Sequence, residues 1–329
     1  MNILHIIGNG FDLSLGLKTS YKHFYDYYSG IESSKDSINK LKKNISSNYN
    51  NWADLELALG QYTSEINSVN EFDEVFEDIG GQLAEYLKNQ EELFDISKVN
   101  RDMFYENLVK PESFLSVIDS NKIAEYKNKY LKQNWQVDIF TFNYTSIIDK
   151  IVGNSGKVKI GNHPRNDATV FLRKIEHIHG YTNDRMVLGV NDVSQLKNKE
   201  FHNNIDILEA IVKSKCNEAY GHSIDNQFKE KLSQANLICI FGSSIGDTDN
   251  IWWEQIGNRI RVDNIPILIF TKGEEVISPR IAYKNNRTKR RMLDYFLRKI
   301  KLEKDEIEAI SPNIFIALDT PMFKEILNK

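Results

Sequence analysis

Four short polar segments interrupt this chain where runs of apolar residues stop. They are rich in small, hydrogen-bonding or titratable residues, the types that bind phosphates, position hydroxyl groups or transfer protons. In an open α/β sheet, ligands bind beyond the carboxyl ends of the strands, so segments of this kind meet along one rim. We therefore expect them to form a cleft that binds a nucleotide. The segments are residues 8–12 (Gly-Asn-Gly-Phe-Asp), 141–145 (Thr-Phe-Asn-Tyr-Thr), 177–180 (His-Ile-His-Gly) and 242–247 (Gly-Ser-Ser-Ile-Gly-Asp).

Each segment also has a simpler structural interpretation. Gly8 and Gly10 let a backbone turn pass close to phosphates, but a tight turn alone favours the same residues. Leu13 stands where the dinucleotide-binding fingerprint has its third glycine. Asn143 could be a helix cap, and residues 242–244 a capping turn, because caps use the same backbone groups as phosphate contacts. Both interpretations stay open at this stage.

The two histidines of the third segment have different expected roles. His177 and His179 are two residues apart on a predicted strand, so their side chains are expected to face the same way. A metal pair is not favoured, because the nearby sequence supplies no third or fourth ligand. We expect His179, next to Gly180 at the strand end, to transfer protons, and His177 to lie deeper, packed or hydrogen-bonded. The two cysteines, Cys216 and Cys239, cannot complete a four-cysteine zinc site, and no metal is expected.

Short apolar runs separated by helical patterns predict an α/β fold with a mostly parallel sheet covered on both sides. Thr19-Ser20 is a predicted cap for a helix that carries Tyr21, Phe24, Tyr25 and Tyr28. From about residue 33 to 131 the patterns are helical, which predicts a large insertion at 31–131 within a sheet domain formed by 1–30 and 132–329. Strands are expected at 3–7, 135–142, 169–179, 185–190, 237–241 and 265–271, with a helix at 247–260.

Composition narrows the class of protein. The chain has 329 residues, of which 41% are hydrophobic and 27% charged, as is typical of a soluble globular protein. No secretory signal or long apolar run is visible, so we expect a cytoplasmic protein without a membrane partner. A net charge of −4 gives no general attraction to nucleic acid. The basic stretch 284–301 is interpreted as a solvated amphipathic helix rather than a nucleic-acid site, because Met292, Leu293, Tyr295, Phe296 and Ile300 interleave with its charges.

The N-terminal segment resembles a known family. Residues 6–13 (Ile-Ile-Gly-Asn-Gly-Phe-Asp-Leu), continuing through Gly16-Leu17-Lys18-Thr19-Ser20-Tyr21 and Phe24, are similar to the AbiH family of phage abortive-infection proteins. The Thr-Phe-Asn-Tyr, His-Gly and Phe-Gly-x-Ser segments fit the same family. More distantly, the order Gly-x-Gly, Thr-x-Asn, His-Gly and Gly-x-Ser resembles the sirtuin fold and its bacterial NAD-hydrolysing relatives. That resemblance implies a Rossmann-like sheet that binds NAD across its carboxyl edge.

The sirtuin-like resemblance also implies site residues. It places Asn143 and His179 at the nicotinamide ribose as the catalytic pair, and it nominates Gly8, Gly10, Gly242 and Ser243 for the pyrophosphate and adenosine. Two positions depart from the pattern: Thr145 replaces the usual Asp, and Asp12 replaces a small hydroxyl residue. Asp12 is therefore expected to bind ribose hydroxyls or to act as a cap. Further expected binding residues from the four segments are Asn9, Phe11, Asp12, Thr141, Tyr144, Gly180, Ser244 and Asp247.

The leading hypothesis is an antiphage effector that hydrolyses NAD at the nicotinamide–ribose bond. Protein deacylation is not expected, because the zinc module of deacylating sirtuins cannot be built. A non-catalytic sensor of NAD or an ADP-ribose derivative, and a nuclease or nucleic-acid-binding effector, are the alternatives. The helical insertion would serve self-association or recognition of a phage-derived trigger, or simply cap the cleft.

Overall fold

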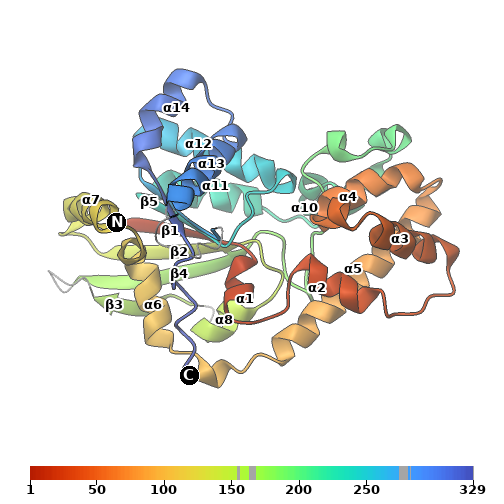
Figure 1. Cartoon of the computed structure of the whole chain (residues 1–329), viewed down its shortest axis with the longest axis horizontal. Coiled ribbons are helices and arrows are strands. Elements are labelled where there is room, and N and C mark those ends of the chain that lie inside the picture. The colour runs from red at the N-terminus through yellow and green to blue at the C-terminus, as the bar shows by residue number, and fades with distance from the viewer. Residues whose placement is uncertain (154–155, 163–167, 274–280, 282, 329) are drawn as a thin grey trace.

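A computed structural model describes residues 1–153, 156–162, 168–273, 281 and 283–328. Its centre is a seven-stranded sheet in the order β3-β4-β2-β1-β5-β6-β7 (Figure 1). Every neighbouring pair is parallel except β3 and β4, so the α/β class with a mostly parallel sheet is confirmed. The strands are β1 (Asn2–Ile7), β2 (Trp135–Thr141), β3 (Val158–Asn162), β4 (Thr169–His177), β5 (Leu237–Phe241), β6 (Ile267–Thr271) and β7 (Ile314–Leu318).

Apolar residues cover both faces of this sheet. Ile3 and Ile7 of β1 belong to one core, and Leu4 and Ile6 belong to another, as the two-residue period of a strand requires. The sheet therefore carries helices on each side. The first core includes α6 (Arg101–Val109), α7 (Val117–Lys127) and α8 (Ile147–Val152); the second includes α11 (Ile224–Gln234), α12 (Asn250–Asp263), α13 (Tyr283–Lys299) and α14 (Lys304–Ile310).

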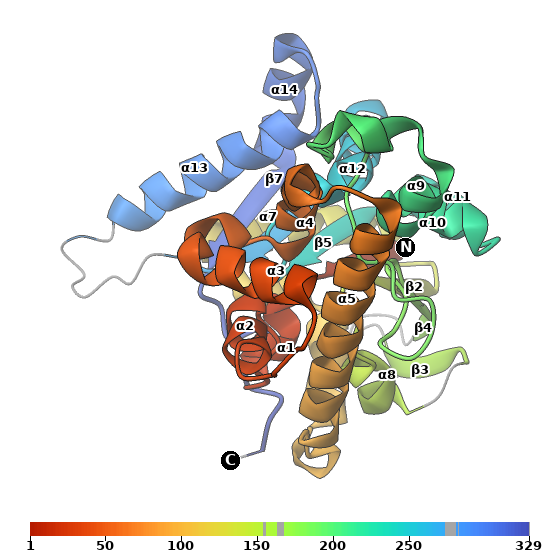
Figure 2. The ribbon, with the colours of Figure 1, turned by 90° about the vertical axis from the view of Figure 1, so that its right-hand side faces the viewer.

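The section between β1 and β2 is helical, and no strand occurs among residues 8–134. Its middle part forms a lobe beside the sheet, in which the helices gather around a third core (Figures 1 and 2). This core also takes Leu188, Val190 and Ile211 from the chain after β4. Ser20 caps its helix by accepting a hydrogen bond from the His23 N–H, as expected. The section comprises α1 (Gly10–Ser14), α2 (Tyr21–Tyr28), α3 (Asp36–Ser47), α4 (Leu55–Tyr62), α5 (Val69–Glu92), α6 and α7.

The observed strands β1, β2, β4, β5 and β6 begin and end within two residues of the predicted bounds. The prediction of a strand at 185–190 is wrong. Residues 185–189 have no strand, and Val190 makes one isolated bridge with Val212. Val187, Leu188 and Val190 are apolar because they are buried in a loop, not because they belong to the sheet. β4 also ends at His177, so the two-residue period does not extend to His179.

Two strands were not predicted from the sequence. β3 is an edge strand whose residues, Val-Lys-Ile-Gly-Asn, mix charge and glycine, because an exposed edge does not require an apolar run. β7 has an apolar run of five residues, too short to separate from a buried helical turn by periodicity. None of the helices in the described ranges is long and apolar enough to cross a membrane.

The turns after β1 and β5 pack backbone against backbone. The Gly10 N–H donates to the Gly242 carbonyl at 2.8 Å, and the Gly8 N–H donates to the Phe241 carbonyl at 2.9 Å. A Cβ on Gly10 would lie 2.4 Å from the Gly242 Cα, closer than atoms can approach. Gly242 itself has φ +65°, a conformation that glycine adopts without strain. Contact between the two turns is therefore sufficient to explain why residue 10 is a glycine, whether or not this turn binds a phosphate.

Gly10→Ala is expected to destabilise the fold by about 1–3 kcal/mol, the usual cost of overpacking a closed contact. Urea unfolding would measure the change. Gly81→Ala is the matched control, because Gly81 lies inside α5 with no atom near its would-be Cβ. That substitution should stabilise the protein by up to about 1 kcal/mol through helix propensity. Equal stability of the two variants would contradict the described turn contact.

Candidate functional site

A cavity of about 870 Å³ opens at the carboxyl ends of the central strands. The turns after β1, β2 and β5 form one side, and residues before and within α4 form the other. It lies where the strand order reverses, between β1 and β5. This is the position at which open α/β sheets bind ligands.

Asp12 is the centre of a buried polar cluster on the cavity wall. Its Oδ1 accepts from the Asn143 amide at 3.0 Å, and its Oδ2 accepts from the Thr145 hydroxyl at 2.5 Å. Burial raises the pKa of Asp12 to about 7, although the bonds from Thr145 and Asn143 oppose that shift. The cluster leaves the Asn143 Oδ1 atom buried and without a hydrogen-bond partner among the described residues. The carbonyl oxygen of this amide is therefore an unsatisfied acceptor at the cavity.

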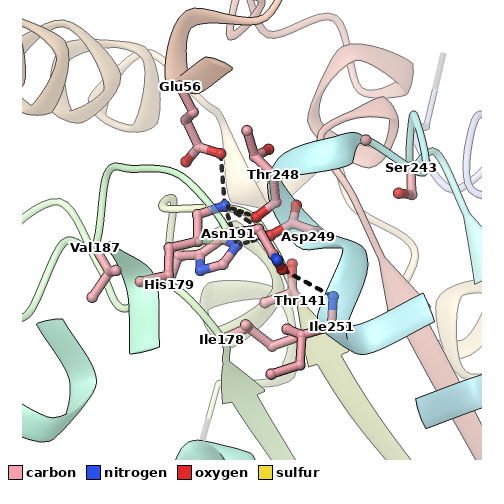
Figure 3. Close-up of polar contacts among 12 residues, drawn as sticks. Glu56, Thr141, Ile178, His179, Val187, Asn191, Ser243, Thr248, Asp249 and Ile251 are labelled. Atoms are coloured by element: carbon pink, nitrogen blue, oxygen red, sulfur yellow. Dashed lines mark hydrogen bonds and ion pairs between the residues drawn. The ribbon is translucent and has the colours of Figure 1, made fainter. Parts of the chain in front are cut away.

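A second cluster surrounds the buried ammonium group of Lys213, at the start of α10 (Lys213–Ala219). Figure 3 shows Glu56, Thr248 and Asp249 of this cluster beside His179. This ammonium donates to Glu56 Oε2 at 2.7 Å, Asp249 Oδ1 at 2.8 Å and the Thr248 carbonyl at 3.1 Å. The other oxygen of Glu56 accepts from the Tyr144 hydroxyl at 2.6 Å. Three chain segments that are far apart in sequence therefore meet at one positive charge.

The charges of this cluster stabilise one another. Burial alone would lower the pKa of Lys213, but the carboxylates of Asp249 and Glu56 raise it above its usual range. Burial alone would raise the pKa of Asp249, but Lys213 and His179 hold it well below its usual value. Burial and the nearby Glu56 carboxylate raise the pKa of Tyr144, so this group stays a hydrogen-bond donor. The cluster thus contains a permanent ion pair at neutral pH.

His179 is held by the same cluster. Its Nε2 lies 2.8 Å from Asp249 Oδ1 and 3.3 Å from the Lys213 nitrogen. Because all three Lys213 protons have oxygen acceptors, the Nε2 atom carries its own proton and donates it to Asp249. The Nδ1 atom then holds a lone pair, and it is buried without a hydrogen-bond partner among the described residues. A carboxylate that orients a histidine in this way is typical of a general base.

His177 does not share this environment. Its Nδ1 lies 2.9 Å from the Asn143 carbonyl oxygen, and its Nε2 lies 2.8 Å from Asp149 Oδ2 in α8. The ring is buried and packs against Tyr181. It is packed and hydrogen-bonded, as expected, and it braces the turn that carries Asn143. Within the described ranges, no group of three or more His, Cys, Asp or Glu side chains could hold a metal ion.

Most of the expected site residues line the cavity. Three of the expected residues, Phe11, Thr141 and Gly180, do not. Phe11 is fully buried and packs edge-on against Phe104 and Phe323 in the sheet core. Thr141 donates to the Ile7 carbonyl and accepts from the Asn143 N–H, so it shapes the turn. Gly180 has φ +72° and packs on the Arg185 backbone. The expected residues that line the cavity are Gly8, Asn9, Gly10, Asp12, Asn143, Tyr144, His179, Gly242, Ser243, Ser244 and Asp247.

Sequence reasoning missed the ionic partners of His179. Glu56 lies in the section of helical patterns at 33–131 and was not singled out, and Asp249 was placed in the helix expected at 247–260. Lys213 follows the buried pair Ile211-Val212, and a lysine after buried apolar residues is the one local signal that could have marked it. Asp54 also lines the cavity, and burial raises its pKa to about 6.

These observations define an α/β protein with a polar cavity at the reversal of its strand order and a buried ionic cluster in the cavity wall. The chain belongs to the AbiH family of bacteriophage abortive infection proteins, whose sequence model matches residues 4–271. No curated protein and no solved structure matched the chain.

Asp12→Asn should change how stability depends on pH. The pKa of Asp12 is raised on folding, so the native state binds more protons than the unfolded state between pH 4 and 7. Stability of the wild type should fall through this window, by about 1.4 kcal/mol per pH unit for this group. The variant cannot titrate; its amide oxygen can still accept from Asn143, and its NH2 group would donate to the Thr145 hydroxyl in place of the present bond. The free energy of unfolding of the variant minus that of the wild type should therefore grow from pH 4 to 7. A difference that stays constant over this range would contradict the raised pKa of Asp12 in the folded protein.

Lys213→Met should destabilise the protein by about 3–5 kcal/mol, because it leaves two carboxylates buried without their counter-charge. Adding Glu56→Gln to this variant should recover part of the loss, since one of the two unpaired charges disappears. Lys215→Met is the control: this neighbouring lysine pairs with Glu218 at the surface, with 43% of its side chain exposed. Its effect should lie within about 0.5 kcal/mol in urea unfolding. Additive effects of the two buried substitutions would argue against the ion pair.

Proposed function

We propose that this protein is an antiphage effector that hydrolyses NAD at the nicotinamide–ribose bond. The observation that carries the proposal is the meeting of Asp12, Asn143 and His179 in one cavity at the carboxyl edge of the sheet. Membership in the AbiH family supplies the abortive-infection role. Depletion of NAD is a chemical means by which an infected cell could be stopped.

The topology supports a Rossmann-like, sirtuin-like interpretation of the fold. From β4 to β7 the parallel strands follow the order β4-β2-β1-β5-β6-β7. Counted along the chain, this is the 3-2-1-4-5-6 order of dinucleotide-binding sheets. The cavity lies at the reversal point, and its volume of about 870 Å³ falls within the range of small-molecule and cofactor sites.

The two departures from the sirtuin pattern compensate for each other in space. The sequence has a hydroxyl, Thr145, where sirtuins have a carboxylate, and a carboxylate, Asp12, where they have a small hydroxyl residue. These two side chains are hydrogen-bonded at 2.5 Å. The same pair of groups is therefore present with the positions exchanged. This exchange supports a retained role for the carboxylate beside Asn143.

The reaction breaks the bond between the ribose C1′ and the pyridinium nitrogen. The bonding electron pair leaves with nicotinamide, which becomes neutral, and a water oxygen bonds to C1′. Asp12 holds the amide of Asn143 so that its free Oδ1 can accept from a ribose hydroxyl or from the water. His179, oriented by Asp249, takes the proton that the water releases. An ionised Asp12 would also stabilise the positive charge that develops on the ribose.

Nicotinamide release from NAD by the purified protein tests this function. His179→Ala should lower the rate by about 10²–10⁴-fold, the usual contribution of a general base. Asn143→Ala should lower it by about 10²–10³-fold, the usual cost of losing a positioned hydrogen-bonding group. His222→Ala is the control, since His222 does not line the cavity and should leave the rate unchanged. Thermal melting must show that all variants are folded.

Other outcomes of this experiment have definite meanings. Binding of NAD without release of nicotinamide, in the presence and absence of phage extract, would contradict hydrolysis and favour a sensor of NAD or an ADP-ribose derivative. Absence of both binding and release would remove NAD from the account of this cavity. Equal loss in His222→Ala would show that the effect is not specific to the site.

A further inference from the structure

The first half of α13 stands away from the rest of the protein. In Figure 2 this helix extends from the body near α14 and its beginning points outward. Its apolar contacts with the core start at Met292 and Leu293, and only Phe296, Leu297 and Lys299 of the helix are buried. Residues 283–291 therefore form an arm, a helical segment that is not needed to fill the core.

The charge of this helix has one sign. Between residues 284 and 301 the chain has eight basic residues and a single acidic one, Asp294, although the whole chain has a net charge of −4. Among the described residues, no ion pair involves Lys284, Arg287, Lys289 or Arg290. A solvated helix face usually mixes charges of both signs, because like charges three or four residues apart repel each other. Within the described part of the chain, these four residues therefore have no ion pair that would offset this repulsion.

The basic groups of the arm surround the helix axis. At about 100° per residue, Lys284 and Arg287 point to one side, Arg290 to the next and Lys289 nearly opposite Arg287. An amphipathic surface helix would place such charges on one face only. Charges on opposite faces can contact two anionic walls at once, one on each side of the helix.

We propose that the arm of α13 binds double-stranded DNA by entering the major groove. A helix with its side chains is about 10–12 Å wide, and the major groove of B-DNA is about 12 Å wide, with a phosphate strand along each side. Lys284, Arg287, Lys289 and Arg290 are placed to contact phosphates on both strands. The deep, narrow major groove of an RNA duplex does not admit a helix, so the shape selects DNA.

The base of the same helix contacts the candidate site. The Tyr295 hydroxyl donates to the Ile245 carbonyl at 3.0 Å, and Lys299 forms an ion pair with Asp247. Tyr295 and Asp247 both line the cavity. Ile245 has φ +54°, an unusual conformation for a β-branched residue, so this turn depends on its surroundings. DNA bound to the arm would therefore contact the helix that supports the cavity rim.

Fluorescence anisotropy with a labelled 20-base-pair DNA duplex, measured across a salt series, tests the proposal on the full chain. The wild type should bind at low salt, with a logarithmic slope set by the number of phosphates contacted. The triple variant Lys284→Gln, Arg287→Gln and Arg290→Gln should lose at least tenfold in affinity, and its slope should fall by about 2.7, or 0.9 for each lost contact.

The control triple variant is Lys40→Gln, Lys43→Gln and Lys88→Gln, which removes the same charge from exposed positions on α3 and α5. It should bind DNA as the wild type does. Equal loss in both triple variants would show general charge attraction and overturn the proposal, as would absence of binding at low salt. Equal affinity for an RNA duplex of the same length would overturn insertion into the major groove. None of these three results bears on NAD hydrolysis, which is measured separately by nicotinamide release.

Discussion

The buried positive charge of Lys213 is the interaction on which the cavity depends. It binds Glu56 from the helical lobe, and Thr248 and Asp249 from the turn before α12. An ammonium group is buried only where acceptors replace the water that it loses. The lobe and the turn before α12 therefore stabilise each other through this one charge. Formation of the cavity is consequently linked to docking of the lobe on the sheet.

This constraint gives the lobe a role in the chemistry that we propose. Asp249 orients His179, and Lys213 fixes the position of Asp249. Glu56 holds Lys213, so a residue of α4 acts on the proposed base through two others. Movement of the lobe would displace Lys213 and Asp249 and so change the orientation of His179. An effector that must stay inactive before infection could be controlled in this way.

The sequence was informative where local chemistry decides the structure. The apolar runs of β1, β2 and β5, the Ser20 cap and the polar segments at the strand ends are all encoded within a few residues. The buried loop at 185–190 was mistaken for a strand, because burial and not pairing makes it apolar. The contact between Glu56 and Lys213 joins residues 157 positions apart, and no short pattern encodes it. The partners Glu56, Lys213 and Asp249 were therefore found only in the structure.

The hydrogen bond between Thr145 and Asp12 shows why spacing alone is a poor guide to this cavity. A site requires a carboxylate at a point in space, and either of two neighbouring turns can supply it. The turns after β1 and β2 are adjacent because their strands pair in parallel, Ile7 opposite Thr141. Their side chains then reach the same volume, and Asp12 occupies it with the amide of Asn143 and the hydroxyl of Thr145. Strand pairing thus decides which side chains of the two turns meet, whatever their separation along the chain.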